Sequence, residues 1–345
     1  MNQSNPSPPL QVSVVLPTYN RRDRLERVLA ALARQTVPVH RWEAIVVSDG
    51  SSDGTNEWLA AQQPPFAMRC LFQENLGVAV ARNNGVAQAR GQIVLFIDDD
   101  VIPAPAWMAE HLRYHERHAR AVVLGPMLPP PDSEFPRSAW VRWEEAMLDK
   151  QYQAMTSGEW QPGARQFYTG NTSLPRDEIV AAGGFDPSFR RAEDVELGYR
   201  LADRGLVFFF NPAAQGLHYA ERSFESWCRT PYLYGRYDVI MTRNKGQDWL
   251  LPAVASEFHG RNGLVRALAR LCVGHEGRKT LAVALLSRLA RLGDGAGIRA
   301  LPRYAYSGVF NLLHYQGVRD EMGSTAAFWQ LIARHAPGAS EKGPC

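Results

Sequence analysis

Short apolar segments recur through the first hundred residues of the chain, and most of them end in a polar turn. Their length and their content of β-branched residues predict buried strands. The predicted strands cover residues 12–16, 44–47, 70–72 and 93–97.

Amphipathic segments lie between these strands. In the first of them Leu25, Val28, Leu29 and Leu32 recur at helical spacing, and Asn20 precedes them as a candidate N-cap. Further helices are predicted over residues 56–61 and 74–89. This alternation predicts an α/β fold with a doubly wound, mostly parallel sheet and right-handed crossovers.

The pattern changes after residue 101. Helices are predicted over residues 107–119 and 193–202, and strands over residues 122–124, 168–174 and 207–210. Residues 138–167 contain several aromatic side chains without a clear period, so no element is predicted there. From about residue 261 the chain is helical and basic, which predicts a C-terminal helical extension.

Composition narrows the class of protein. A net charge of +3 over 345 residues is too small to indicate a nucleic-acid partner. The four cysteines are scattered without a CxxC pair, which favours reduced thiols and a cytoplasmic location. No segment reaches the ~18 consecutive apolar residues of a membrane-spanning helix, so the expected protein is soluble or attached to the inner face of a membrane. Residues 1–10, polar and rich in proline, are expected to be a disordered leader.

Three carboxylates stand directly after the strand predicted at residues 93–97. Asp98, Asp99 and Asp100 would repel one another unless a cation or a solvated turn relieves the repulsion. Ligands of open α/β sheets bind at the carboxyl ends of the strands, and oxygen clusters of this kind suit Mg²⁺ or Mn²⁺ shared with substrate phosphates. The alternative is an ordinary Asp-rich turn.

Two more polar loops should meet the aspartates at the same edge of the sheet. Thr18, Tyr19 and Asn20 form the first, and residues 48–55 form the second. Their hydroxyl, amide and carboxylate groups suit a base and a ribose, with Asp49 able to accept from a base N–H. Asp49 is equally consistent with a turn residue before Gly50. No phosphate-binding GxxxxGK[ST] motif is present.

The order of these motifs resembles that of family 2 glycosyltransferases. The resemblance covers roughly residues 11–225 and departs from the family at Ser48, where a second Asp is usual. The QxxRW motif of processive members is missing after Trp227, which favours transfer of one sugar. The matching segments are Leu16-Pro17-Thr18-Tyr19-Asn20, residues 46–55, Asn75-Leu76-Gly77, Ala81-Arg82-Asn83, residues 96–100, Thr169-Gly170-Asn171, Gly183-Gly184-Phe185-Asp186 and residues 193–197.

The resemblance implies an inverting, metal-dependent transferase of the nucleotide-diphospho-sugar (GT-A) fold. Residues 11–235 would form the transferase domain, with a nucleotide-binding half at 11–125 and an acceptor half at 126–235, and residues 236–345 the extension. A divalent metal, Mg²⁺ or Mn²⁺, would be held by Asp98, Asp100 and His218. The donor site would comprise Pro17, Thr18, Tyr19, Asn20, Asp49, Ser51, Asn75, Gly77, Arg82, Asp98 and Asp99. The acceptor site would comprise Gly170, Asn171, Gly183 and Gly184.

Direct displacement with inversion also needs a base on the acceptor hydroxyl, and Asp194, beside Glu193, fits that role. The start of a helix should keep Asp194 ionised, so its strength as a base is expected to come from positioning. The alternative is a carboxylate that only complements the helix dipole. His218 is equally consistent with a structural histidine, whereas His111, His115 and His118 are interpreted as an exposed helix face.

The expected reaction transfers one sugar from a nucleotide-diphospho-sugar donor to a hydroxyl of a saccharide or a lipid-linked acceptor. A non-catalytic nucleotide-sugar-binding protein and a sugar nucleotidyltransferase remain alternatives. The basic helices after Arg261 fit either contact with an anionic membrane or a cap packed on the catalytic domain. Their leucines share helical faces: Leu264, Leu268 and Leu271 on one, and Leu281, Leu285, Leu289 and Leu292 on the other.

Overall fold

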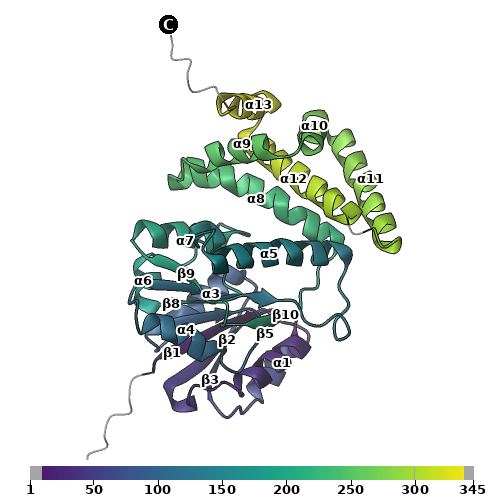
Figure 1. The fold of residues 1–345 in the computed structure, drawn as a ribbon. Helices are drawn as coiled ribbons and strands as arrows, with labels where there is room; N and C mark the ends of the chain where they lie inside the picture. Colours follow the sequence, from purple (N-terminus) through teal and green to yellow (C-terminus); the bar gives the residue numbers. More distant parts are fainter. Residues whose placement is uncertain (1–9, 299, 338–345) are drawn as a thin grey trace, which may run out of the picture. The chain divides into compact units, whose positions relative to one another are not determined.

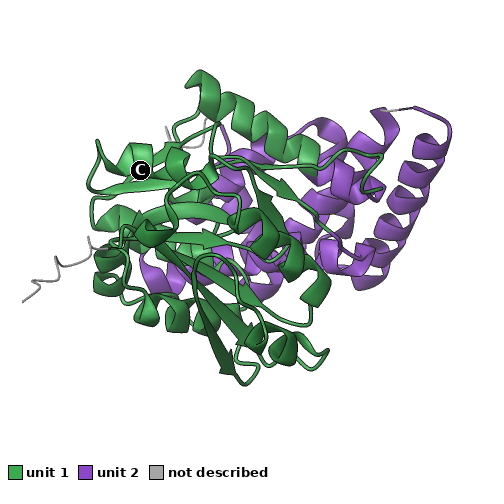
Figure 2. Ribbon diagram, turned by 90° about the horizontal axis from the view of Figure 1, so that it is seen from below, with its two compact units in different colours: residues 1–136, 145–220 green, residues 137–144, 221–345 purple. Residues whose placement is uncertain are grey.

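The computed structural model describes residues 10–298 and 300–337. The chain divides into two compact units, shown in Figure 2. The sheet unit contains residues 1–136 and 145–220, and the helical unit contains residues 137–144 and 221–345. The predicted disordered leader falls almost entirely on residues outside the described part of the chain.

The sheet unit is built on a seven-stranded sheet in the order β3-β2-β1-β4-β8-β6-β9 (Figure 1). Strands β3, β2, β1 and β4 are parallel to one another, and β8 is antiparallel to both of its neighbours. The predicted doubly wound, mostly parallel α/β fold is therefore confirmed. The strands are β1 (Val12–Thr18), β2 (Trp42–Asp49), β3 (Ala67–Gln73), β4 (Ile93–Ile97), β6 (Ala121–Leu124), β8 (Asn171–Pro175) and β9 (Val207–Phe210).

Helices connect these strands and cover the sheet. Leu25, Val28, Leu29 and Leu32 of α1 are buried in the same core cluster as the side chains of β1, β2 and β4, as their helical spacing predicts. The helices of this part are α1 (Arg22–Leu32), α2 (Thr55–Ala60), α3 (Val78–Gln88), α4 (Trp107–His115), α5 (Ala139–Ser157), α6 (Arg176–Ala181) and α7 (Glu193–Asp203), with 3₁₀ turns η1 (Val39–Arg41) and η2 (Ala164–Gln166).

A second sheet has three short strands in the order β5-β10-β7. Strand β5 (Val101–Pro103) directly follows the three aspartates and pairs antiparallel with β10 (Gly216–His218), which pairs in turn with β7 (Met127–Leu128). His218 is the register partner of Val101. This pairing brings His218 next to the aspartates, although more than a hundred residues of chain separate them.

The expected N-cap at Asn20 is wrong. Helix α1 begins at Arg22, and its N-cap residue is Arg21, whose side chain makes no capping hydrogen bond. Asn20 instead has a left-handed backbone (φ 52°), and its Oδ1 accepts a hydrogen bond from the Ser52 N–H at 2.7 Å. Asn tolerates this conformation better than most residues do, and here its amide ties two loops together.

Residues 138–167, where no period was visible, contain the 19-residue helix α5. Residues 139–144 of this helix belong to the helical unit, and the remainder belongs to the sheet unit. Trp143 packs edge-on against Trp227, while Tyr152 stacks on Phe210. The buried face of the helix changes along its length, so a single hydrophobic period does not describe it.

The helical unit contains a closely packed helix pair. A Cβ atom added at Gly235 of α8 would lie 2.1 Å from the His314 carbonyl oxygen, and one at Gly317 of α12 would lie 2.0 Å from that of Tyr232. The predicted boundary at residue 235 falls inside α8, whereas the compact units divide at residue 220. The helices are α8 (Phe224–Lys245), α9 (Leu250–Gly260), α10 (Gly263–Cys272), α11 (Glu276–Gly295), α12 (Ala300–Met322) and α13 (Thr325–Arg334). In the part of the chain that is described, no helix has the length and apolar character needed to cross a bilayer.

The expected exposed histidine face is wrong for His111 and His115 of α4, whereas His118, which follows the helix, is exposed. His111 is fully buried, and its ring nitrogens lie 2.9 Å from Ser173 Oγ and 2.9 Å from Asn171 Oδ1. His115 Nε2 lies 2.8 Å from the same Ser173 hydroxyl. Burial lowers the pKa of His111 to about 3 and that of His115 to about 4, so both are neutral in the folded protein.

These two histidines should make the fold acid-sensitive. Below the unfolded pKa of about 6.5 the unfolded chain binds protons that the folded protein excludes, so stability falls as the pH drops from about 6.5 toward 4. Each histidine contributes up to about 1.4 kcal/mol per pH unit in that window. Urea unfolding at about pH 7 and pH 5 should show a smaller loss for His115→Gln than for the wild type. The control His40→Gln, at an exposed site, should lose as much unfolding free energy as the wild type. Equal losses in all three proteins would contradict the conclusion that His115 is buried in its neutral form.

Candidate active site

The polar loops at the carboxyl ends of β1, β2 and β4 lie together, as their parallel register requires. Thr18 is opposite Ser48 in the β1–β2 pairing. The Thr18 hydroxyl donates to Asp99 Oδ2 at 2.8 Å, which connects the ends of β1 and β4. The Asn20 N–H donates to Ser51 Oγ at 3.0 Å, which connects the ends of β1 and β2.

Asp49 holds the loop that follows β3. Its carboxylate accepts from Gln73 Nε2 and from the backbone N–H groups of Leu76 and Gly77, at 2.8 to 2.9 Å. Gly50 is needed here because a Cβ atom on it would lie 2.6 Å from the Asn75 nitrogen. The predicted donor residues Asp49, Asn75 and Gly77 are therefore brought together, with Asp49 fixing the turn that carries the other two.

Arg21, which sequence reasoning missed, contacts two of the three aspartates. Its Nη1 lies 2.8 Å from Asp99 Oδ1 and 3.0 Å from Asp100 Oδ2. Burial raises the pKa of Asp99 to about 6, against the opposing effect of the Arg21 charge. A signal was present in the sequence, because Arg21 directly follows the loop at the end of β1, the strand next to β4.

Asp100 and His218 form the part of the site best suited to a cation. His218 Nε2 lies 3.6 Å from Asp100 Oδ1. Metal–ligand bonds of about 2.1 Å allow one Mg²⁺ or Mn²⁺ to reach two atoms at that separation. Among residues 10–298 and 300–337, no group of three or more His, Cys, Asp or Glu side chains is placed to hold a metal. A site that relies on one or two protein ligands plus substrate phosphates does not need such a group, so Asp100 and His218 fit a divalent metal without Asp98, the third predicted ligand, which pairs with Arg82.

Arg82 links the aspartates to the start of α7. Its guanidinium is buried, with Nη2 at 2.9 Å from Asp98 Oδ1 and Nη1 at 2.7 Å from Glu193 Oε1. The sequence analysis included Arg82 in the donor site. In the structure both terminal nitrogens bind carboxylates, and Asp98, which is more exposed than its two neighbours, is oriented by this contact.

Asp194 follows Glu193 in the first turn of α7. Ala192, directly before the helix, has a left-handed backbone (φ 58°), which is uncommon for a residue with a Cβ atom. Burial, followed by the neighbouring Glu193 carboxylate, raises the pKa of Asp194 to about 7, although the Arg82 charge opposes the shift. The expectation that the helix start keeps Asp194 ionised, so that its strength as a base comes from positioning, is therefore wrong, because desolvation outweighs the helix terminus and raises the pKa.

The predicted acceptor residues fall into two groups. A Cβ atom on Gly170 would lie 2.5 Å from Met127 Sδ and 3.0 Å from Asp98 Oδ2, so glycine lets the backbone approach the aspartate. Gly184 (φ 71°) leaves room for Asn83, whose amide donates to the Phe185 carbonyl and accepts from its N–H at 2.8 Å. Gly183 (φ 85°) belongs to the same turn.

The predicted acceptor-binding role of Asn171 is wrong. It is fully buried, and its amide donates to the carbonyls of Pro126 and Ala214 while accepting from Trp107 Nε1. With His111 as a further partner, the side chain is committed to the protein interior. Asn171 therefore supports the loop that carries Gly170, and no part of its side chain faces solvent.

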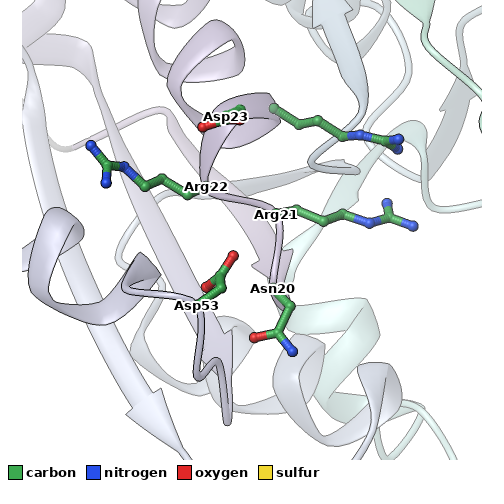
Figure 3. Close-up of a pocket in the computed structure, with 6 residues that line it drawn as sticks. Asn20, Arg21, Arg22, Asp23 and Asp53 are labelled. Atoms are coloured by element: carbon green, nitrogen blue, oxygen red, sulfur yellow. The ribbon is translucent and has the colours of Figure 1, made fainter.

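The remaining donor residues differ in exposure. Pro17 and Thr18 are buried within β1, whereas Tyr19 and Asn20 are exposed. Beside them the start of α1 forms a depression of about 480 Å³ (Figure 3). Arg21 and Arg22 point to opposite sides of the chain there, so Arg21 is free to reach the aspartates while Arg22 is directed away. The depression is lined by Asn20, Arg21, Arg22, Asp23, Arg24 and Asp53.

The sheet unit has the doubly wound α/β architecture that the sequence predicts, with polar loops gathered at the carboxyl ends of β1, β2 and β4. Residues 13–170 match the family described as "Glycosyl transferase family 2". Over these residues the chain is similar to family 2 glycosyltransferases.

Two relatives extend the match in sequence. Validoxylamine A glucosyltransferase of Streptomyces hygroscopicus subsp. jinggangensis is 35% identical over 231 residues, which are 60% of this chain and 54% of that protein. The uncharacterized glycosyltransferase YfnE of Bacillus subtilis is 30% identical over 245 residues, 58% of this chain and 62% of that protein. The match therefore spans little more than half of each relative's length.

Solved structures share the fold at lower identity. A mannosyltransferase of Pyrobaculum calidifontis in complex with GDP-Man and Mn²⁺ has a TM-score of 0.58 and 19% identity, covering 90% of this chain and 89% of that one. S. aureus TarS in complex with UDP has a TM-score of 0.53 and 17% identity, covering 91% of this chain and 92% of that one. At these identities the likeness concerns the fold.

Replacement of Arg82 should destabilise the sheet unit. Arg82→Met leaves the carboxylates of Asp98 and Glu193 without their cation, and removing one partner of a buried ion pair costs about 3–5 kcal/mol. Urea unfolding measures the loss. The control Arg34→Met, at an exposed helix end, should stay within about 0.5 kcal/mol of the wild type. A loss below about 1 kcal/mol for Arg82→Met would show that the bridge is not structurally important.

Proposed function

We propose that this protein is an inverting, metal-dependent glycosyltransferase that moves one sugar from a nucleotide-diphospho-sugar to a hydroxyl of a saccharide or lipid-linked acceptor. The observation that carries the proposal is the Arg82 bridge, which brings the aspartates after β4 close to the carboxylates at the start of α7. Displacement at an anomeric carbon needs a leaving-group site and a base site facing each other, and these two carboxylate groups can supply them. The family 2 match of residues 13–170 supports the same reaction.

The donor would bind over the loops that end β1, β2 and β3. Tyr19 and Asn75 are exposed there, and Ser51 and Gly77 contribute polar backbone and side-chain groups at the same edge. Asp100 and His218 would hold a divalent cation. Asp98, which Arg82 orients, would lie near the sugar of the donor. Bound there, the cation would neutralise the charge that develops on the departing diphosphate.

The chain's own groups would act on the acceptor. Asp194 accepts the proton of the acceptor hydroxyl while the oxygen forms its bond to the anomeric carbon from the side opposite the diphosphate. The bond from that carbon to the diphosphate oxygen breaks, and its electron pair leaves with the nucleoside diphosphate. Burial, followed by the neighbouring Glu193 carboxylate, raises the pKa of Asp194 to about 7 against the opposing Arg82 charge, and a pKa near neutrality suits a general base.

Substitution of Asp194 should separate binding from transfer. Asp194→Asn removes the proton acceptor and keeps the shape, so nucleoside diphosphate release should fall by about 10²–10⁴-fold while donor-induced thermal stabilisation persists. Asp203→Asn, at the exposed end of the same helix, is the matched control and should retain full activity. Near wild-type release by Asp194→Asn would refute the base assignment. No release by the wild type with any acceptor would favour the binding-protein alternative.

The pH dependence follows from the same group. Because the base must be ionised, the transfer rate should rise with pH through a midpoint near 7 and then level off. Glu193→Gln removes the neighbouring negative charge that raises the pKa of Asp194, so its midpoint should move to lower pH. Rate profiles at saturating donor measure both midpoints. A profile that is flat between about pH 5 and 9 in the wild type would contradict a titrating carboxylate base.

If Asp100 and His218 hold the metal, replacing either should remove the Mn²⁺-dependent part of nucleotide binding. Nucleoside diphosphates should raise the melting temperature more in the presence of Mn²⁺ than in its absence, because metal and diphosphate share one site. In Asp100→Asn and His218→Gln the Mn²⁺-dependent part of this shift should disappear. His275→Gln, an exposed histidine of the helical unit, is the control and should keep it. A shift of equal size in all variants would place the metal elsewhere.

A further inference from the structure

Helix α11 of the helical unit is apolar on two sides. Its inner side is buried through Ser287, Ala290 and Gly293, and Leu286 approaches Gly308 of α12. Its other side exposes four leucines with between 41% and 70% of their surface in contact with solvent. Those leucines are Leu281, Leu285, Leu289 and Leu292. A helix that only caps a core needs one apolar stripe, so the second stripe has no packing function within the described chain.

The adjacent helix α10 also exposes leucines. Leu264 is 85% exposed and Leu271 is 61% exposed, while Val265, Ala269 and Cys272 on its other side are buried. The Leu271 carbonyl accepts a hydrogen bond from Arg278 Nη1, so the end of α10 contacts the start of α11. We call these six exposed leucines of α10 and α11 the outer leucine face.

The outer leucine face is accompanied by positive charge. Arg270, Arg278, Arg288 and Arg291 are all exposed on the same two helices. The acidic residues of α11 are already engaged, because Glu276 pairs with Lys279 and Asp294 pairs with Arg142. Apolar side chains flanked by arginines without an ion-pair partner among the described residues distinguish this surface from ordinary scattered surface leucines.

We propose that the outer leucine face lies on the surface of an anionic lipid bilayer. Leucines on one side of a helix can enter the boundary between headgroups and acyl chains, while arginines beside them contact lipid phosphates. Helix α11 has 20 residues, which gives about 30 Å of length lying in the membrane plane. This proposal concerns a surface outside the candidate active site and does not depend on the proposed glycosyl transfer.

A second copy of the chain fits this surface less well. Symmetric pairing of the same face on two molecules would bring the arginines of one copy against those of the other. An anionic bilayer presents the opposite charge to the same arginines, so the positive charge that opposes self-association by repulsion favours lipid binding by attraction.

Vesicle sedimentation of the full-length protein tests the proposal. The wild type should pellet with vesicles of equal phosphatidylcholine and phosphatidylglycerol, and not with phosphatidylcholine alone. Leu285→Ser/Leu292→Ser should lower the partition coefficient by about tenfold or more, because both side chains lose the apolar area they would bury. The matched control Val180→Ser/Val207→Ser changes two valines of the sheet unit that are each 55% exposed, and it should bind like the wild type.

A charge variant tests the second half of the argument. Arg288→Gln/Arg291→Gln should bind more weakly, and salt should weaken the wild type, because screening shortens the reach of the charges. Arg34→Gln/Arg117→Gln, two exposed arginines of the sheet unit, is the control. Unchanged binding of both the leucine and the arginine variants would overturn the proposal, as would equal wild-type binding to neutral vesicles. A dimer that dissociates in the leucine variant without vesicle binding would overturn it in favour of self-association.

Discussion

The candidate site depends on a single buried guanidinium. Arg82 binds Asp98, 16 residues away, and Glu193, 111 residues away, so it joins the parallel half of the sheet to the helix that carries Asp194. Burying a charge is unfavourable unless its partners are placed to compensate it, and here two carboxylates from different segments do so. The same contact orients Asp98 and acts on the pKa of Asp194. Structure and proposed chemistry therefore rest on the same interaction.

Charge at the site is incompletely balanced. Asp98, Asp99, Asp100, Glu193 and Asp194 face the guanidiniums of Arg21, Arg24 and Arg82. A diphosphate arriving at this edge would add more negative charge, so a divalent cation would relieve repulsion that the chain itself leaves in place. Burial relieves part of this repulsion without a cation, because it raises the pKa of Asp99 to about 6 and that of Asp194 to about 7 and so favours their neutral forms. The Arg21 contact with Asp99 and Asp100 suggests how the aspartates are held before such a cation binds.

The sequence predicted what depends on local period and missed what depends on distant partners. Strands and α1 follow from apolar runs and from leucine spacing, and the register of parallel strands then requires the polar loops to meet. The prediction that Asn20 caps α1 is wrong because its side-chain amide oxygen accepts a hydrogen bond from Ser52, 32 residues away. His111 was predicted on an exposed helix face, but Ser173 and Asn171 form hydrogen bonds with its ring nitrogens inside the protein. The acceptor role of Asn171 came from the family motif alone, and nothing local in the sequence reveals that its amide is already fully hydrogen-bonded.

Ser48 shows how a departure from the family pattern is accommodated. It is fully buried, and its hydroxyl donates to Ser51 Oγ, which in turn accepts from the Asn20 N–H. A neutral hydroxyl can join such a chain of hydrogen bonds, whereas a buried carboxylate at this position would need a cation or further donors. The carboxylate next to it, Asp49, has three N–H donors from the loop after β3. Asp49 therefore acts first as a positioning residue, and any selectivity for a base would be set by the loop whose shape it fixes.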